Sequence, residues 1–324
     1  MSRSRALAAL RIGVAVVILA AVVWAFGRNW TAVADQLARV GAGPLALALL
    51  LALVGPTLAM LGWRVLLADL GSPLPVASAA GVFFVGQLGK YLPGSVWTVL
   101  AQAEMGARLA VPRRRSAVVG LLGIGLSVLS GILVGLASVP LLWRSGAAGT
   151  LGWTVLAVPL LVLACWPRLL NALVAWGLRL LRREPLEHAL SARAVMLTMC
   201  WFVGSWLAFG AQTWVLAMAV EPGELSGRGA GALVLAAVSG YALAGTVGML
   251  AVVSPAGLGV REGLLVLLLD SATGRPAALA VVLLSRFTIT VGDVVVAGLG
   301  WTYARRHGLL SAHPGAGPTA YREE

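Results

Sequence analysis

Long apolar runs, separated by short polar segments, make up most of the chain. Six of the runs are about as long as a membrane crossing requires, roughly 20 residues of helix. We therefore predict an all-α, polytopic membrane protein in a single transmembrane domain, residues 1–324. The predicted full spans are residues 7–26, 43–68, 117–143, 150–166, 194–220 and 277–303.

The first run, residues 7–26, follows Arg3 and Arg5 and so resembles a secretory signal peptide. It lacks a convincing small-residue cleavage site before Trp24 and Phe26. We therefore interpret it as an uncleaved first span with a cytoplasmic N-terminus.

Two further apolar regions, residues 76–109 and 229–269, are interrupted by glycine and proline. The breaks fall at Pro93-Gly94 and at Pro255-Ala256-Gly257. Bare backbone is tolerated at membrane depth only where protein buries it or water reaches it, so two broken helices suggest a cavity. Paired breaks in corresponding positions of two halves also point to a transporter-like binding site. We predict that both regions are re-entrant hairpins.

Basic residues set the predicted orientation. Lys90 is the only lysine among the 24 basic residues, and the arginines concentrate in segments that this scheme places in the cytoplasm. Both termini are then cytoplasmic, and we expect the protein to reside in the cell membrane. The arginines predicted to face outward are Arg28, Arg39, Arg144, Arg228 and Arg275.

Each predicted half, residues 1–146 and 147–304, contains two spans, a hairpin and a span. Three crossings are an odd number, so the halves form an inverted repeat, followed by a disordered cytoplasmic tail at 305–324. In the alternative topology, residues 229–253 cross completely and the C-terminus lies outside.

Composition excludes an ordinary soluble domain, because 60% of residues are hydrophobic and 11% charged, with a mean hydropathy of +0.93. The formal net charge of +12 does not indicate nucleic-acid binding, since the arginines lie mainly in loops between spans. Residues 168–193 mix leucines with arginines, as in a basic amphipathic helix on the inner surface. Cys165 and Cys200 lack metal-ligand spacing, so we expect no disulfide, metal site or cofactor.

Charged residues within the apolar regions are candidate functional residues, because each costs about 2.5 to 3.5 kcal/mol to insert. Lys90 either binds a lipid phosphate or reaches toward the headgroups. Arg261 and Glu262 either serve the site or neutralise each other. Arg286 requires a partner, which is Glu262, Asp293 or a substrate anion.

The breaks themselves supply further candidates. They begin half-helices whose free N–H groups and positive dipole ends suit an anionic headgroup. The side chains of Gln87, Tyr91 and Gln102 are candidate headgroup ligands, and packing between helices is the alternative for the glutamines. The candidate proton carriers are Glu104, Glu262 and Asp293. The break residues in this set are Pro93, Gly94, Ser95, Pro255, Gly257 and Gly259.

Three features together resemble the lysylphosphatidylglycerol synthase transmembrane-region family, also called flippase-like integral membrane proteins. They are the segment Leu88–Trp97, the segment Ser254–Glu262, and Arg286 in the last span. The resemblance implies a protein that translocates or binds an anionic lipid or lipid-linked glycan. One alternative is an accessory subunit that presents a lipid to a membrane glycosyltransferase or another envelope-synthesis enzyme. A third hypothesis is an intramembrane transferase.

Two departures from the family pattern matter. Many relatives carry Arg and Glu just after the first Pro-Gly, where this chain has Ser95, Val96 and Trp97. The soluble aminoacyl-transferase domain of some members is absent from the sequence, so we do not expect the chain to be an enzyme that makes aminoacylated lipid.

Overall fold

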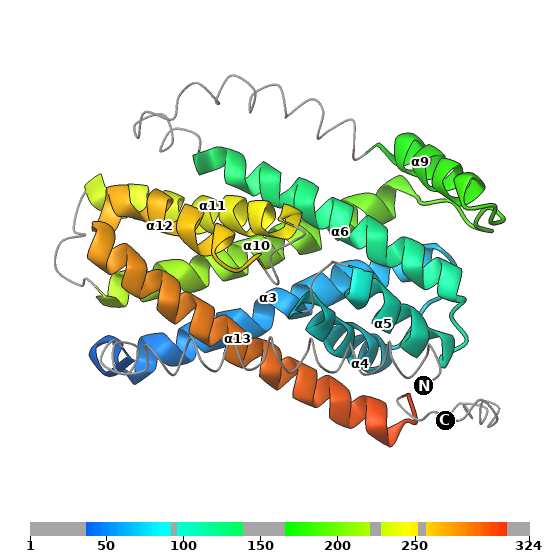
Figure 1. Ribbon diagram of the computed structural model, residues 1–324, viewed down its shortest axis with the longest axis horizontal. Helices are drawn as coiled ribbons and strands as arrows, with labels where there is room; N and C mark the ends of the chain where they lie inside the picture. Colours follow the sequence, from blue (N-terminus) through cyan, green and yellow to red (C-terminus); the bar gives the residue numbers. More distant parts are fainter. Residues whose placement is uncertain (1–36, 92–95, 139–165, 221–227, 252–256, 310–324) are drawn as a thin grey trace, which may run out of the picture.

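The computed structural model describes residues 37–91, 96–138, 166–220, 228–251 and 257–309. Within these ranges every regular element is helical, as the hydrophobic pattern predicts (Figure 1). The elements are α3 (Ala42–Asp69), α4 (Val76–Gln87), the 3-10 turn η1 (Leu88–Tyr91), α5 (Val96–Ala107), α6 (Arg113–Gly135), the 3-10 turn η2 (Leu136–Ser138), α9 (Pro167–Leu180), α10 (Ala192–Val220), α11 (Arg228–Leu250), α12 (Val260–Thr273) and α13 (Arg275–Arg306).

Five helical segments in the described ranges are long and apolar enough to cross a membrane: α3, α6 with η2, α10, α11 and α13. Four of them match the predicted spans 43–68, 117–143, 194–220 and 277–303. The fifth, α11, is the first arm of the second broken region and is long enough for the complete crossing of the alternative topology. The chain is thus a multi-pass helical membrane protein. The predicted spans 7–26 and 150–166 lie outside the described residues.

Helices α3 and α10 pack closely and antiparallel, and small residues allow the two helices to approach each other. A Cβ on Gly62 would lie 2.8 Å from the Phe202 ring, so the ring occupies the space that any side chain would need. Thr198 Oγ1 donates a hydrogen bond to the Gly62 carbonyl at 3.2 Å. Glycine with interhelical hydroxyl bonds is the usual way in which membrane helices associate, because lipid offers no hydrophobic drive between them.

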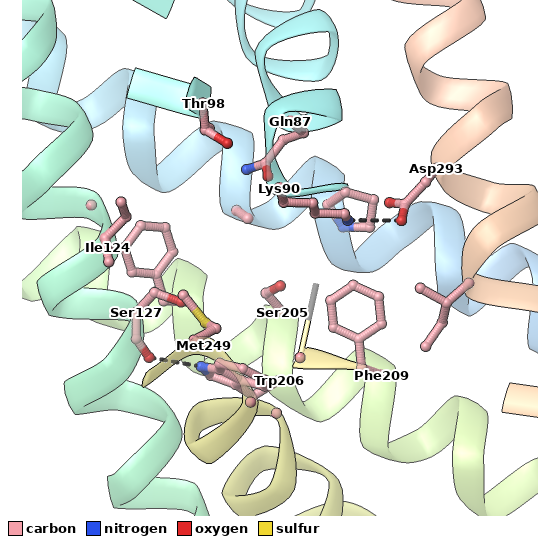
Figure 2. A pocket seen from close by; sticks show the side chains of 18 of the residues that line it. Gln87, Lys90, Thr98, Ile124, Ser127, Ser205, Trp206, Phe209, Met249 and Asp293 are labelled. Atoms are coloured by element: carbon pink, nitrogen blue, oxygen red, sulfur yellow. Dashed lines mark hydrogen bonds and ion pairs between the residues drawn. The ribbon is translucent and has the colours of Figure 1, made fainter. Parts of the chain in front are cut away.

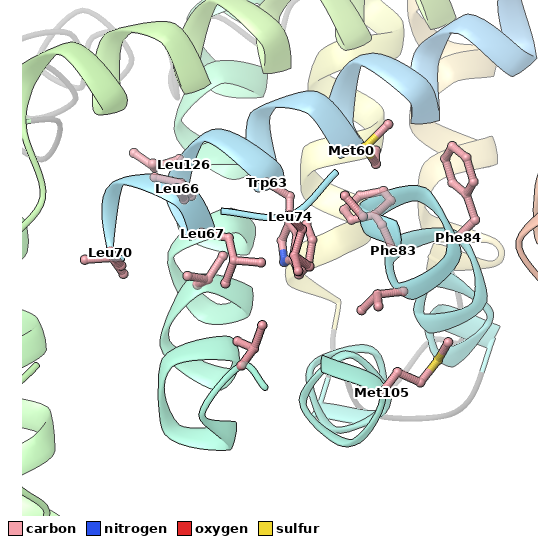
Figure 3. Packing of buried hydrophobic residues seen from close by; sticks show 14 of the residues in the cluster. Met60, Trp63, Leu66, Leu67, Leu70, Leu74, Phe83, Phe84, Met105 and Leu126 are labelled. Carbon is pink, nitrogen blue, oxygen red and sulfur yellow. The ribbon is translucent and has the colours of Figure 1, made fainter. Parts of the chain in front are cut away.

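One end of the bundle is filled by a cluster of buried apolar side chains (Figure 3). Trp63 of α3 and Phe83 of α4 lie in its centre, with ring centroids 5.8 Å apart. The cluster therefore anchors α4 against α3 on the side away from α12. Its largest members include Met60, Leu66, Leu67, Leu70, Phe84, Met105 and Leu126.

Helix α13 shows how the two broken regions are placed, because each contacts a different end of it. At the C-terminal end, Ser78 at the start of α4 is hydrogen-bonded to Tyr303 at 2.9 Å. Arg108, just after α5, donates to the Gly308 carbonyl at 3.4 Å. At the N-terminal end, α12 runs directly into α13 through Gly274. The two regions approach the middle of the molecule from opposite ends (Figure 1).

The arms of the breaks are short. Helices α4 and α5 have 12 residues each and α12 has 14, or about 18 to 21 Å of helix at 1.5 Å per residue. A hydrocarbon core is roughly 30 Å thick. None of these three arms alone is long enough to cross it.

The amphipathic helix predicted for residues 168–193 is shorter than expected, since α9 ends at Leu180. The chain then folds back, because the Asn171 side chain bonds both the N–H and the carbonyl of Leu190, at 2.8 and 3.0 Å. Arg115 in the first turn of α6 holds the same segment through Glu187 at 2.6 Å. The basic run Arg113–Arg115 is therefore helical and organises the loops at this end. Helix α13 continues to Arg306, and residues 310–324 of the predicted tail lie outside the described part.

Candidate functional site

A glycine in each broken region lets its two arms touch. A Cβ on Gly89 would lie 2.5 Å from the backbone nitrogen of Thr98, so only glycine fits where η1 meets α5. Gly257 has φ of +69°, which L side chains rarely adopt, and a Cβ there would lie 2.9 Å from the Gly248 backbone. The breaks are thus closed by backbone contact, which brings the flanking side chains to fixed positions.

Residues of both broken regions line one cavity of about 270 Å³. From the first region it takes Gln87, Lys90, Tyr91, Thr98 and Gln102, and from the second Gly248, Met249, Gly257 and Arg261. Helices α3, α6, α10 and α13 complete its wall. Residues far apart in the sequence therefore form a single site.

Lys90 and Tyr91 of the first break both bind Asp293 of α13. The Lys90 ammonium lies 2.7 Å from Asp293 Oδ2, and the Tyr91 hydroxyl donates to the same oxygen at 2.6 Å. The Asp293 side chain is 7% exposed, whereas that of Lys90 is 34% exposed. Lys90 therefore offers the more accessible charge of this pair to the cavity.

Glu262 joins the second break to α13. Its Oε1 accepts hydrogen bonds from Arg261 at 3.1 Å and from Arg286 at 3.2 Å. Its Oε2 accepts the Gly259 backbone N–H at 2.7 Å, so the acid also caps the start of α12. The sequence prediction that this N-terminus is free for a headgroup thus changes, because Glu262 already occupies its first donor.

Arg261 is additionally held against an aromatic ring. Its guanidinium carbon lies 5.7 Å from the Tyr241 ring centroid, and Nη1 donates to the Tyr241 hydroxyl at 3.4 Å. Tyr241 in turn stacks on Phe209, with centroids 5.5 Å apart. This cation–π contact orients Arg261 while leaving its charge in place.

The cavity has a charged part and an apolar part (Figure 2). Gln87 and Lys90 face the space from the first break, opposite Trp206 and Phe209 of α10. Trp206 Nε1 is fixed by the Ser127 carbonyl at 3.0 Å. Its indole therefore presents a ring to the cavity and keeps its polar atom satisfied.

Most described candidates from the sequence meet here. Eight line the cavity: Gln87, Lys90, Tyr91, Gln102, Gly257, Arg261, Arg286 and Asp293. Glu262 does not line it but pairs with two cations that do. Gly259 starts α12 outside the lining. Four candidates, Pro93, Gly94, Ser95 and Pro255, lie outside the described residues.

Glu104 lies apart from the cavity. Its side chain is 65% exposed and forms a bidentate pair with Arg113, with both distances 3.0 Å. The hydrogen bond from Arg113 holds the pKa of the Glu104 carboxyl below its ordinary value. The group stays ionised at neutral pH and faces away from the breaks, so its position does not suit the proton-carrier role predicted for it.

Sequence reasoning missed the contribution of the long helices α6, α10 and α11 to the site. Tyr241, Ser127 and Ser205 line the cavity from α11, α6 and α10. Each is a polar-tipped residue inside an apolar run, and that was the available signal. Trp206 and Phe209 carried none, because an aromatic residue in a span is ordinary core or lipid-facing material.

A family model described as "Lysylphosphatidylglycerol synthase TM region" matches residues 10–297. A search of curated proteins finds no match.

Proposed function

The chain belongs to the lysylphosphatidylglycerol synthase transmembrane-region family, and from this membership and the charged cavity we propose that it binds and translocates a lipid with an anionic headgroup. The observation that carries the proposal is the convergence of Lys90, Arg261 and Arg286 on one cavity between two broken helices. Cations inside an apolar bundle are costly and are kept where they serve a pathway or a ligand.

The shape and lining of the cavity suit the polar end of a lipid. Its volume of about 270 Å³ lies just below the range of roughly 300 to 1,000 Å³ that is usual for small-molecule sites. That space holds a headgroup and leaves no room for acyl or prenyl chains. In the proposal the tails remain in the bilayer, and apolar residues such as Trp206 and Phe209 receive the glycerol or the first methylenes.

The opposed approach of the two broken regions supports movement as well as binding. Each region reaches the site from its own end, and each is held to α13 by an ion pair, Lys90–Asp293 or Arg286–Glu262. Loosening one pair while the other holds would open the site toward one end at a time, which is the requirement for alternating access. We propose that both regions are re-entrant hairpins of an inverted repeat in the cell membrane, with both termini cytoplasmic.

In this proposal the chain forms and breaks no covalent bond. Movement is then downhill, coupled to an ion, or driven by a partner such as a membrane glycosyltransferase. Among the described residues that line the cavity, Asp293 is the only acid, so a proton-coupled version of the proposal assigns the proton to it.

Reconstitution tests the proposal. Purified protein in liposomes with a fluorescent phosphatidylglycerol in both leaflets should make the inner label accessible to an added quencher faster than in protein-free liposomes. Lys90→Gln should slow this exchange strongly. Glu104→Gln is the matched control, because it also removes one charge but lies outside the cavity, and it should behave as wild type.

Two other results would change the conclusion. Saturable lipid binding without exchange would replace translocation by the accessory role, in which the protein presents a lipid to a separate enzyme. Neither binding nor exchange would reject the proposal.

A further inference from the structure

Among the residues that the structure describes, the charges at the cavity do not balance. Three cations and two acids form one cluster, here called the five-charge cluster: Lys90, Arg261, Arg286, Glu262 and Asp293. Its formal net charge is one positive unit. The breaks add nothing to this sum, because residues 92–95 and 252–256 contain no ionisable side chain.

The cluster acts on the cavity as a unit. Arg286 and Asp293 are seven residues apart on α13, about 10 Å along the helix axis. Charges at such distances in a poorly solvated bundle are little screened. The side chains of Arg261, Arg286 and Asp293 are at most 14% exposed. A ligand in the cavity therefore experiences the sum of the five charges.

The other described polar residues of the lining are neutral. Gln87, Thr98 and Gln102 donate and accept hydrogen bonds without changing the charge. They suit hydroxyl groups of a headgroup and offer no compensation for a second negative charge. Ser127 and Ser205 on the opposite side are neutral as well.

Resting on the proposed function, we infer that this site selects its lipid by charge: it takes a headgroup with one negative charge, a phosphodiester, in preference to phosphomonoester, diphosphate and zwitterionic headgroups. A monoanion brings the cluster to neutrality. A dianion leaves a surplus negative charge in the apolar bundle, and a zwitterion leaves the positive charge uncompensated, and each uncompensated buried charge is costly.

The Lys90–Asp293 pair provides a way to change the net charge in single steps. Lys90→Gln gives a neutral cluster, and Asp293→Asn gives two positive units. The double variant Lys90→Gln/Asp293→Asn loses both members of the pair and returns to one positive unit. It is the matched control, because it shares each substitution with one single variant but has the charge of wild type.

Binding is measured in detergent with three lipids that share dihexanoyl tails: phosphatidylglycerol, phosphatidylcholine, and phosphatidic acid at about pH 8, where a phosphomonoester carries close to two negative charges. Wild type should bind phosphatidylglycerol most tightly of the three lipids. The double variant lacks Lys90 and should bind every lipid more weakly, but it should keep the same order of affinities. Asp293→Asn should shift the ratio of affinities toward phosphatidic acid by about tenfold or more, and Lys90→Gln should remove the preference over phosphatidylcholine.

The headgroup without tails, glycerophosphoglycerol, identifies the source of the phosphodiester. It should bind more weakly than the lipid by about tenfold or more, because no tail contacts the apolar part. Equal affinity would overturn the lipid assignment in favour of a soluble phosphodiester.

Two results would overturn the charge rule while the proposed function stands. The first is wild type binding phosphatidic acid at least as tightly as phosphatidylglycerol. The second is a double variant that behaves like either single variant, since one side chain rather than the net charge would then decide. If Asp293→Asn does not fold, the comparison of wild type, Lys90→Gln and the double variant still decides. Binding of none of the lipids would overturn the proposed function and, with it, this inference.

Discussion

Arg286 and Asp293 lie two turns apart on α13, and each connects this helix to a different broken region. Arg286 reaches the second region through Glu262 at 3.2 Å, and Asp293 reaches the first through Lys90 at 2.7 Å. Helix α13 thus supplies a negative charge, Asp293, to the first broken region and a positive charge, Arg286, to the second. Any change in the position of either break must rearrange an ion pair on α13, so the pairs are both scaffold and candidate gates.

Arg286→Gln should weaken lipid binding more than it weakens folding. Glu262 keeps Arg261 as a partner at 3.1 Å, so no acid is left unpaired, and the loss of stability should be smaller than the roughly 3 to 5 kcal/mol typical of breaking a buried pair. Affinity for phosphatidylglycerol should fall by about tenfold or more, because the cluster becomes neutral. Thermal stability and binding are measured on the same detergent-purified protein. Lost stability with unchanged binding would leave Arg286 as scaffold.

Glu262→Gln, in contrast to Arg286→Gln, should mainly reduce stability, and it should do so strongly. Within the described part of the chain, it removes the acid that pairs with both Arg261 and Arg286. We expect a loss of about 3 to 5 kcal/mol, since two buried guanidinium groups then repel each other. Glu104→Gln is the matched control and should cost about 1 kcal/mol or less, because its pair with Arg113 is exposed. Equal melting temperatures for the two variants would show that Glu262 does not hold the break.

Gly89→Ala should destabilise the first break. The new Cβ would lie 2.5 Å from a backbone atom of α5, which has no flexible side chain to move aside. A loss of about 1 to 3 kcal/mol is expected from overpacking. Gly263→Ala in α12 is the control, because nothing lies within 4 Å of its added Cβ, and it should be neutral or slightly stabilising through helix propensity. Differential scanning fluorimetry of the two variants makes the comparison, and a neutral Gly89→Ala would contradict the close contact.

The proposed orientation places the two ends of α13 on opposite sides of the membrane. Single cysteines at exposed positions, Ser271→Cys near the end of α12 and His307→Cys after α13, should differ in a background without Cys165 and Cys200. A membrane-impermeant maleimide added to intact cells should label position 271 and leave position 307 unlabelled until the membrane is permeabilised. The reverse pattern would invert the topology, and labelling of both positions would mean that α13 does not cross.

The sequence by itself determined the class of protein and the places where its helices break. A span is recognised locally, because roughly 20 apolar residues are needed to cross the hydrocarbon core. A helix break is also a local feature. Gly257, for example, has a positive φ, which glycine adopts readily and other residues rarely do. The sequence also marked Lys90, Arg261 and Arg286 as candidate site residues, because inserting a charged side chain into the membrane costs free energy.

Only the tertiary structure decided which of these charges are partners. Arg286 had Glu262, Asp293 or a substrate anion as candidate partners, and Asp293 is the nearer of the two acids in the sequence. A separation of seven residues on one helix is too long for direct contact, however, so Glu262, 24 residues away, became the partner when α12 folded back against α13. Glu104 and Gln102 show the same dependence. They are two residues apart on α5, so they face different sides of the helix, and packing against the rest of the bundle buried Gln102 at the cavity and left Glu104 exposed. Which charges form ion pairs, and which side of a helix is buried, depend on contacts between distant segments. A local sequence pattern does not contain that information.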